Sequence, residues 1–212
     1  EAQQRFRNDP DTDYHQMTLD LMHWTDRHLA KNFNFGSIYG LGYRSFAVRF
    51  KQSLLKAHPD ADPDHLEGLS KSLMDEYFSK VTFAKPTCNH IQEVATKRGY
   101  VRTLSGRRQR LPTDGKTYKL VNYLIQGSAS DILKKGLVTG WDDGVFDELT
   151  MHATVHDENV FSIPQTKHGY DACMTLKEDM LNAYQLKIPL GVDTEIGPNW
   201  GHCTMDNWKQ FS

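Results

Sequence analysis

Four side chains at a constant spacing suggest a site for a ligand that carries phosphates and a base. Arg27, Lys31, Phe35 and Tyr39 follow one another at intervals of four residues, so on an α-helix they share one slowly drifting face. The two cations can neutralise phosphate oxygens, and Arg can do so bidentately. The two aromatic rings can stack on a base or a sugar. Ordinary amphipathic helices also show this spacing, so the spacing alone leaves both interpretations open.

A second candidate site is the string MHATVHDENVFSIP, in which His156, Asp157 and Glu158 stand between β-branched and apolar residues. The pattern predicts two strands, over residues 149–155 and 159–163, joined by a tight turn. A carboxylate pair at such a rigid tip can bind Mg²⁺, which prefers oxygen ligands. A lone His-Asp-Glu string is a weak signal and needs support from its surroundings.

The charges are distributed unevenly, although the formal net charge is only −2. Residues 140–160 contain six acids and no Lys or Arg. Residues 95–119, the basic tract, contain one acid and eight basic residues: Lys97, Arg98, Arg102, Arg107, Arg108, Arg110, Lys116 and Lys119. A basic tract attracts phosphates and a carboxylate cluster attracts cations, but two solvated surfaces would give the same distribution.

Helical patterns dominate the first part of the chain and strand patterns come late, which predicts an α+β fold. Apolar periodicity and turn residues place the elements. We expect helical structure over residues 15–31 that continues through the face of residues 27–39 and ends or bends near Gly40, and further helices over residues 43–58, 66–83, 87–98, 118–139 and 169–184. We expect a hairpin over residues 99–112, the two strands named above, and a last strand near residues 192–196.

Composition narrows the class of protein. No apolar run approaches the ~20 residues that a membrane span needs, and the opening EAQQRFRNDPD has no signal-peptide core. The three cysteines, Cys88, Cys173 and Cys203, are widely spaced without a C-x-x-C motif, which favours reduced packing residues and a cytoplasmic setting. The charged opening does not resemble the start of a complete domain.

The string RHLAKNFNFGSIYG resembles motif B, R-x3-K-x3-F-G-x2-Y-G, the fingers helix of family A DNA polymerases, the bacterial polymerase I group. The resemblance implies that Arg27 and Lys31 bind the triphosphate, with Lys31 counted among the catalytic residues. Phe35 would pack against the incoming sugar and base, and Tyr39 would sit where the templating base enters. The preceding DYHQMT resembles the D-x-H-T element, in which His15 would contact the triphosphate. The short gap between the two elements is similar to phage members.

Two further strings resemble DNA-binding elements of the same family. GYVRTLSGRRQRLP is similar to G-Y-x-x-T-x-x-G-R-R-x-x-x-P, which lies near the primer–template duplex, and implies a DNA contact for Arg107. NYLIQGSASD is similar to N-x-x-x-Q-G-x-A-x-D and implies that Asn122 and Gln126 reach the minor groove near the primer end. Every base pair carries minor-groove acceptors, so amide donors there can check pair geometry without reading sequence.

The string around Asp157 resembles motif C of the family, at the turn of a palm hairpin. The resemblance implies that Asp157 and Glu158 are catalytic metal ligands, Asp157 being the better placed, and that His156 touches the primer terminus. Two Mg²⁺ ions are implied, one activating the primer 3′-hydroxyl and both neutralising charge on the phosphates. If a phage encodes the chain, the cytoplasmic setting expected from the cysteines is the cytoplasm of the host cell.

Parts of the family's right hand are missing from this sequence. Nothing before Asp13 resembles motif A, D-Y-S-Q-I-E, which supplies the second metal-binding aspartate, and no thumb or exonuclease is recognisable. We therefore expect an incomplete right hand, with helical fingers over residues 1–145, including a helix 118–139 that packs toward the palm, and the C-terminal part of the palm over residues 146–212. The chain should be inactive alone, as one fragment of a split or cleaved polymerase.

The expected partners are primer–template DNA, dNTPs and a second polypeptide that carries motif A, the thumb and the rest of the palm, across a large and partly apolar interface. A processivity factor is a further candidate partner, and no membrane is expected. The alternative is a non-catalytic DNA-binding or regulatory protein derived from the polymerase fold. A single-subunit RNA polymerase shares some of this layout, but the NYLIQG and HDE strings fit DNA enzymes better.

Overall fold

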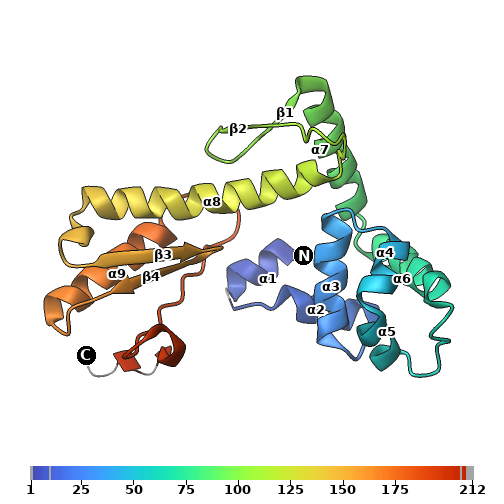
Figure 1. Ribbon diagram of the computed structural model, residues 1–212, viewed down its shortest axis with the longest axis horizontal. Helices are drawn as coiled ribbons and strands as arrows, with labels where there is room; N and C mark the ends of the chain where they lie inside the picture. Colours follow the sequence, from blue (N-terminus) through green and yellow to red (C-terminus); the bar gives the residue numbers. More distant parts are fainter. Residues whose placement is uncertain (1, 10, 206, 209–212) are drawn as a thin grey trace. The chain divides into compact units, whose positions relative to one another are not determined.

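The structure is a computed structural model that describes residues 2–9, 11–205 and 207–208. Helices dominate it and two short antiparallel hairpins complete it, which confirms the predicted α+β class (Figure 1). In chain order the elements are α1 (Ala2–Asn8), α2 (Tyr14–Met22), α3 (Arg27–Ile38), α4 (Tyr43–Arg49), α5 (Lys51–Ala57), α6 (Leu66–Lys80), α7 (Ala84–Arg98), β1 (Tyr100–Arg102), β2 (Arg108–Arg110), α8 (Lys119–Asp142), η1 (Val145–Asp147), β3 (Thr150–Val155), β4 (Glu158–Ser162), α9 (Lys167–Leu181) and η2 (Trp200–His202).

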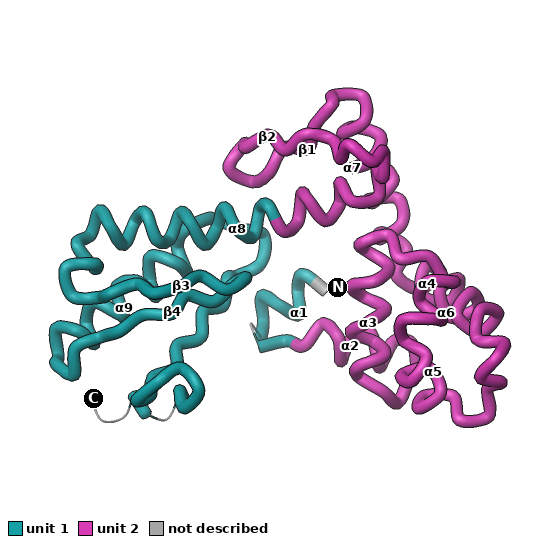
Figure 2. Tube along the Cα trace, viewed as in Figure 1, with its two compact units in different colours: residues 1–12, 127–212 teal, residues 13–126 magenta. Residues whose placement is uncertain are grey.

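The chain divides into two compact units, shown in different colours in Figure 2. Residues 13–126 form the helical unit, and residues 1–12 with 127–212 form the mixed unit. The division falls inside α8, whereas we had placed the boundary between fingers and palm at residue 145. The assignment of fingers and palm stays a prediction.

The core of the helical unit is built around the ring of Phe33, which is fully buried. Its centroid lies 4.1 Å from that of Phe46 and 4.8 Å from that of Trp24. Leu29 and Leu54 are buried in the same cluster. Because α3 contributes two of these side chains, the core fixes which face of α3 points inward.

The predicted helix over residues 15–31 is in fact two helices, because local backbone interactions end the first one early. His23 adopts a left-handed conformation with φ 56°, and its N–H donates to the carbonyls of Asp20 and Leu19. Asp26 then starts α3, since its side chain accepts from the N–H of His28 at 2.8 Å. Asp is a preferred N-cap residue, so the signal for this second start was present in the sequence.

The core of the mixed unit is smaller and contains Val145, Leu149 and Leu176. There β3 and β4 pair antiparallel, with Val155 opposite Glu158 next to the turn. The strand predicted near residues 192–196 is wrong except for one bridge. Among the described residues of this segment, Ile196 forms an isolated bridge with Thr204, and the two exchange backbone hydrogen bonds.

No helix within the described residues is long and apolar enough to cross a membrane.

A glycine substitution tests the packing at the end of α3. Gly40 has φ +78°, and a Cβ there would lie 2.8 Å from the Cβ of Tyr118. We expect Gly40→Ala to lower the free energy of unfolding by about 2 kcal/mol or more, from left-handed strain and overpacking. Gly68, exposed within α6 with nothing within 4 Å of its added Cβ, is the matched control.

Gly68→Ala should raise the free energy of unfolding by roughly 0.5–1 kcal/mol, because alanine loses less backbone entropy in a helix. Urea unfolding followed by circular dichroism measures both variants. If both substitutions changed the free energy of unfolding in the same direction, the explanation of Gly40 by strain and overpacking would be contradicted.

Candidate nucleotide site and carboxylate turn

The outer face of α3 carries the four side chains that the spacing grouped together. The inner face is buried by Leu29, Ala30, Phe33, Asn34 and Ser37. Arg27, Lys31 and Phe35 are exposed, and Tyr39, which caps the helix, is half-buried. The predicted helix over residues 27–39 is therefore confirmed, while the functional roles of its side chains stay predictions.

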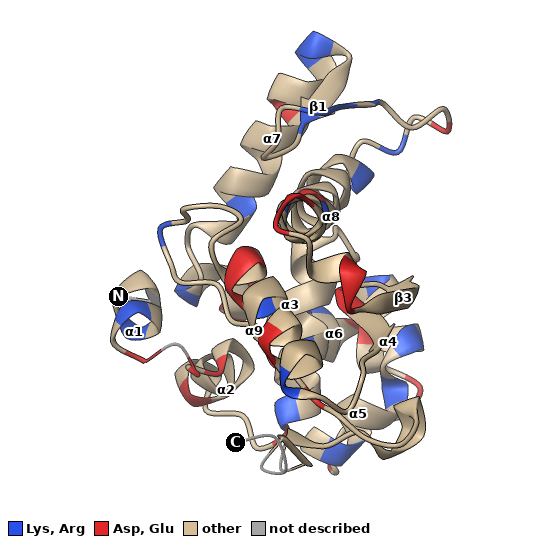
Figure 3. Cartoon of the chain, turned by 90° about the vertical axis from the view of Figure 1, so that its left-hand side faces the viewer, with Lys and Arg blue, Asp and Glu red and all other residues tan. Residues whose placement is uncertain are grey.

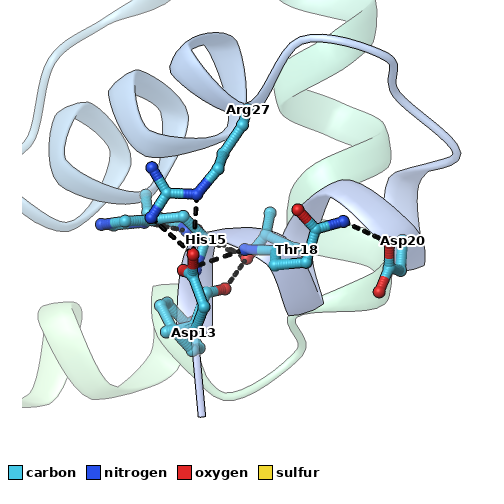
Figure 4. Close-up of polar contacts among 8 residues, drawn as sticks. Asp13, His15, Thr18, Asp20 and Arg27 are labelled. Atoms are coloured by element: carbon cyan, nitrogen blue, oxygen red, sulfur yellow. Dashed lines mark hydrogen bonds and ion pairs between the residues drawn. The ribbon is translucent and has the colours of Figure 1, made fainter. Parts of the chain in front are cut away.

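Asp13 anchors Arg27 at the start of this face, as Figure 4 shows. The Nε of Arg27 donates to Oδ2 of Asp13 at 2.7 Å, and the other carboxylate oxygen caps α2 by accepting from the N–H groups of His15 and Gln16. Desolvation works to raise the pKa of Asp13, but the Arg27 and backbone hydrogen bonds outweigh it and lower the pKa. Asp13 thus stays ionised and orients the guanidinium.

His15 lies beside these charges with its ring half-buried. Desolvation lowers the pKa of His15, the negative charge of Asp13 opposes this, and the positive charges of Arg27 and Lys31 lower it further. At neutral pH the imidazole is therefore mainly neutral. Lys31 forms no ion pair with any residue that the structure describes, so its ammonium group is available to a ligand.

Three rings continue the face from His15 to the end of α3. The ring centroid of Phe35 lies 5.3 Å from that of His15 and 6.0 Å from that of Tyr39, the latter pair stacked with an interplanar angle of 18°. Phe35 keeps 44% of its surface exposed, although Asn34 beside it is buried. Along α3 the positively charged side chains come first and the aromatic rings follow. This order suits a nucleotide, whose triphosphate can meet the cations while its base meets the rings.

Gln126 meets Tyr39 at the far end of this face. Its Nε2 donates to the Tyr39 hydroxyl at 2.9 Å, so two residues that we assigned separately to DNA lie in direct contact. Asn122, one turn earlier on α8, is half-buried, and its Oδ1 is buried with no hydrogen-bond partner in the described part of the chain. The amide oxygen of Asn122 therefore faces protein.

The basic tract forms the hairpin of β1 and β2 and its flanks, where Figure 3 shows Lys and Arg side by side along the chain. Arg107 lies exposed in the connection, directly after Gly106 with φ +86°. Arg108 stands over the ring of Tyr100 at 4.9 Å. Lys116 and Lys119 both pair with Asp114, so part of the positive charge of the tract is neutralised internally.

In the mixed unit, His156 and Asp157 form the turn between β3 and β4, and Glu158 is the first residue of β4. All three side chains are exposed. His156 has φ 57° although it is not glycine, a conformation that costs about 1 kcal/mol or more and recurs at functional sites. The strained turn presents two carboxylates at the tip of the hairpin.

Glu158 is held by a residue that sequence reasoning missed. Trp200 Nε1 donates to Oε1 of Glu158 at 2.7 Å. The donor chemistry of Asp157 and Glu158 fits Mg²⁺, but their number does not: within the described residues, no three His, Cys, Asp or Glu side chains cluster closely enough to hold a metal ion.

The structure thus brings His15, Arg27, Phe35, Tyr39 and Gln126 together within the helical unit, and places the carboxylate turn in the mixed unit. The anchoring role of Asp13 was also missed. An Asp before a helix start was a visible N-cap signal, but its contact with a side chain 14 residues away was not. Nothing local in the sequence signalled the contacts of Trp200 and Gln126.

Comparisons with known proteins agree with these features. The model of the DNA polymerase family A matches residues 6–202. A DNA-directed DNA polymerase of Pseudomonas phage M6 is 32% identical over 95% of this chain and 33% of its own length. DNA polymerase I of Deinococcus radiodurans is 31% identical over 82% of this chain and 18% of its own length. The chain therefore spans no more than a third of these relatives.

A solved structure shares the fold. The POL domain of Pol1 from M. smegmatis, in complex with a DNA primer-template and dNTP, superposes with a TM-score of 0.72 at 25% sequence identity, over 89% of this chain and 34% of that one. The family model covers nearly all of the chain. The chain belongs to DNA polymerase family A.

Proposed function

We propose that this chain takes part in template-directed DNA synthesis, the addition of a dNTP to a primer 3′-hydroxyl, as one part of a family A polymerase. A second polypeptide that carries motif A, the thumb and the rest of the palm would complete it. The observation that carries the proposal is the outer face of α3, where anchored and free cations lead into stacked rings. The relative from M. smegmatis, whose structure holds primer-template and dNTP, supports it.

In this proposal each residue of that face contacts a different part of the nucleotide. Arg27, oriented by Asp13, and Lys31 bind the triphosphate, and charge-assisted hydrogen bonds to phosphate are the strong kind. The exposed ring of Phe35 packs against the incoming sugar and base. Tyr39 and Gln126, joined at 2.9 Å, bind where template and primer meet the new base pair, together with Asn122, Arg107 and His156.

Asp157 and Glu158 would supply this chain's share of a Mg²⁺ site, with Trp200 fixing the direction of Glu158. Bound Mg²⁺ would activate the primer 3′-hydroxyl and neutralise charge on the phosphates. The described residues contain no cluster of three candidate ligands, so in this proposal the second polypeptide supplies the remaining carboxylate. The chain alone is then inactive.

The hairpin of β3 and β4 supports the need for a second polypeptide. Within the described residues it is a two-stranded sheet, and Phe161 of β4 packs against the core of Val145, Leu149 and Leu176. Met151 and Val155 of β3 are 39% and 38% exposed. A partner that adds strands and covers these side chains would satisfy the sheet edge.

Complementation tests the catalytic part of the proposal. The chain mixed with a polypeptide carrying the family's upstream portion should extend a primer with dNTPs in Mg²⁺. Asp157→Ala should lower the rate roughly 10³-fold or more, because a lost metal ligand removes several kcal/mol of transition-state stabilisation. Asp171→Ala, which removes an exposed carboxylate from α9, should leave the rate unchanged.

Extension that survives Asp157→Ala would contradict the proposed role of the carboxylate turn. Salt-sensitive DNA binding without extension by any complementing polypeptide would favour the alternative, a non-catalytic DNA-binding protein. A preference for rNTPs over dNTPs in the same assay would instead indicate an RNA polymerase.

Lys31 tests the nucleotide face. In the complemented enzyme, Lys31→Ala should raise the KM for dNTP about 10- to 100-fold, the effect of one charge-assisted phosphate contact. Lys71→Ala, which removes an exposed ammonium group from α6, is the control and should leave the KM unchanged. Equal effects of the two substitutions would show that Lys31 acts only through the overall charge.

A further inference from the structure

The side chain of Asn34 connects the buried and the exposed faces of α3. It is 2% exposed and immediately precedes Phe35. Its Nδ2 lies 2.9 Å from Oγ1 of Thr18 and 3.0 Å from Nδ1 of His15, and its Oδ1 lies 3.0 Å from the hydroxyl of Tyr77. All of these residues belong to the helical unit. A buried amide with partners on both ends is held in one orientation.

The hydrogens of this network can be assigned by counting donors and acceptors. The hydroxyl of Tyr77 also interacts with the side chain of Tyr14, and with the amide placed as it is, Oδ1 of Asn34 accepts the Tyr77 hydroxyl hydrogen. The Thr18 hydroxyl donates to the carbonyl of Tyr14 at 3.1 Å or to Oδ1 of Asn34 at 3.1 Å, and in both cases its oxygen can accept from Nδ2. The second hydrogen on Nδ2 points to Nδ1 of His15, which must then accept it.

An accepting Nδ1 decides where His15 carries its proton. A neutral imidazole has one N–H, so with Nδ1 as acceptor the proton resides on Nε2. A protonated ring would turn an Nδ1–H against the amide hydrogens. Desolvation and the charges of Arg27 and Lys31, opposed by Asp13, also keep the pKa of the ring low. The rings of Tyr14 and Phe35 are the other neighbours of the His15 ring.

We propose that Asn34 is a positioning residue that holds His15 as the Nε2–H tautomer, so that the ring offers the triphosphate a hydrogen-bond donor. The opposite tautomer would present the lone pair of Nε2, and phosphate oxygens, themselves acceptors, would be repelled. Asn34 thereby adds a neutral donor beside Arg27 and Lys31. The proposal rests on the proposed role of His15 in binding dNTP, but its first consequence is visible without any nucleotide.

The tautomer is measured directly in the ¹⁵N-labelled chain without nucleotide. Long-range ¹H–¹⁵N correlation spectra at mildly alkaline pH distinguish protonated Nε2 from protonated Nδ1, and His15→Ala identifies the signal among the 10 histidines. We expect the His15 proton on Nε2. A proton on Nδ1 in the unmodified chain would overturn the proposal, whether or not any variant folds.

Asn34→Asp supplies the matched perturbation, because a carboxylate of the same shape can only accept and will draw a proton onto Nδ1. Asn32→Asp places the same charge two residues earlier on α3 and should leave the His15 tautomer on Nε2. A tautomer that stays on Nε2 in folded Asn34→Asp would overturn the role of the amide.

A double-mutant cycle connects the tautomer to nucleotide binding by the chain. Asn34→Asp should weaken the binding of dATP with Mg²⁺ about tenfold or more, and should cost little further affinity in a His15→Ala background. Additive losses, or no binding of dATP by the unmodified chain, would overturn the proposed route from Asn34 to the triphosphate. Failure of primer extension with these results intact would count against the proposed function alone.

Discussion

The burial of one face of α3 is the constraint on which the nucleotide face depends. Phe33 fills the centre of the helical unit between Phe46 and Trp24. Successive residues of an α-helix are rotated by about 100°, so a helix that buries Phe33 and Leu29 must turn Lys31 and Phe35 outward. The exposed ring of Phe35 is therefore a consequence of the core, and a change in the packing of Phe33 would rotate the site as a whole.

The sequence predicted those features that depend on short spacings. The face of α3, the hairpin turn at His156 and Asp157, and the helix that carries Gln126 all follow from periodicity and turn residues, and the structure has them. It could not predict contacts that tertiary packing creates, such as Gln126 with Tyr39, 87 positions apart, or Trp200 with Glu158. The break at His23 was missed for a related reason. The apolar periodicity continues through His23 and predicts one helix, but local backbone capping ends the helix there.

Two kinds of side-chain support distinguish the two candidate sites. Arg27 on α3 is held from within this chain by Asp13, and the neighbouring His15 by Asn34 with its buried partners. Among the described residues, the carboxylates stand on a two-stranded hairpin, and Trp200 donates to Glu158. In the proposed function, a nucleotide face supported within the chain and a metal site with only two carboxylates are what a part of a larger catalytic centre should show.

The central claim, that the outer face of α3 binds the incoming nucleotide, is most directly tested by mapping where a dNTP contacts this chain. Backbone and side-chain NMR signals of the labelled protein would be followed while dATP is titrated in. The account predicts that the largest shifts fall on α2 and α3, at His15, Arg27, Lys31 and Phe35, with saturation at a common Kd. Shifts confined to the hairpin of β1 and β2, with α3 unchanged, would contradict it.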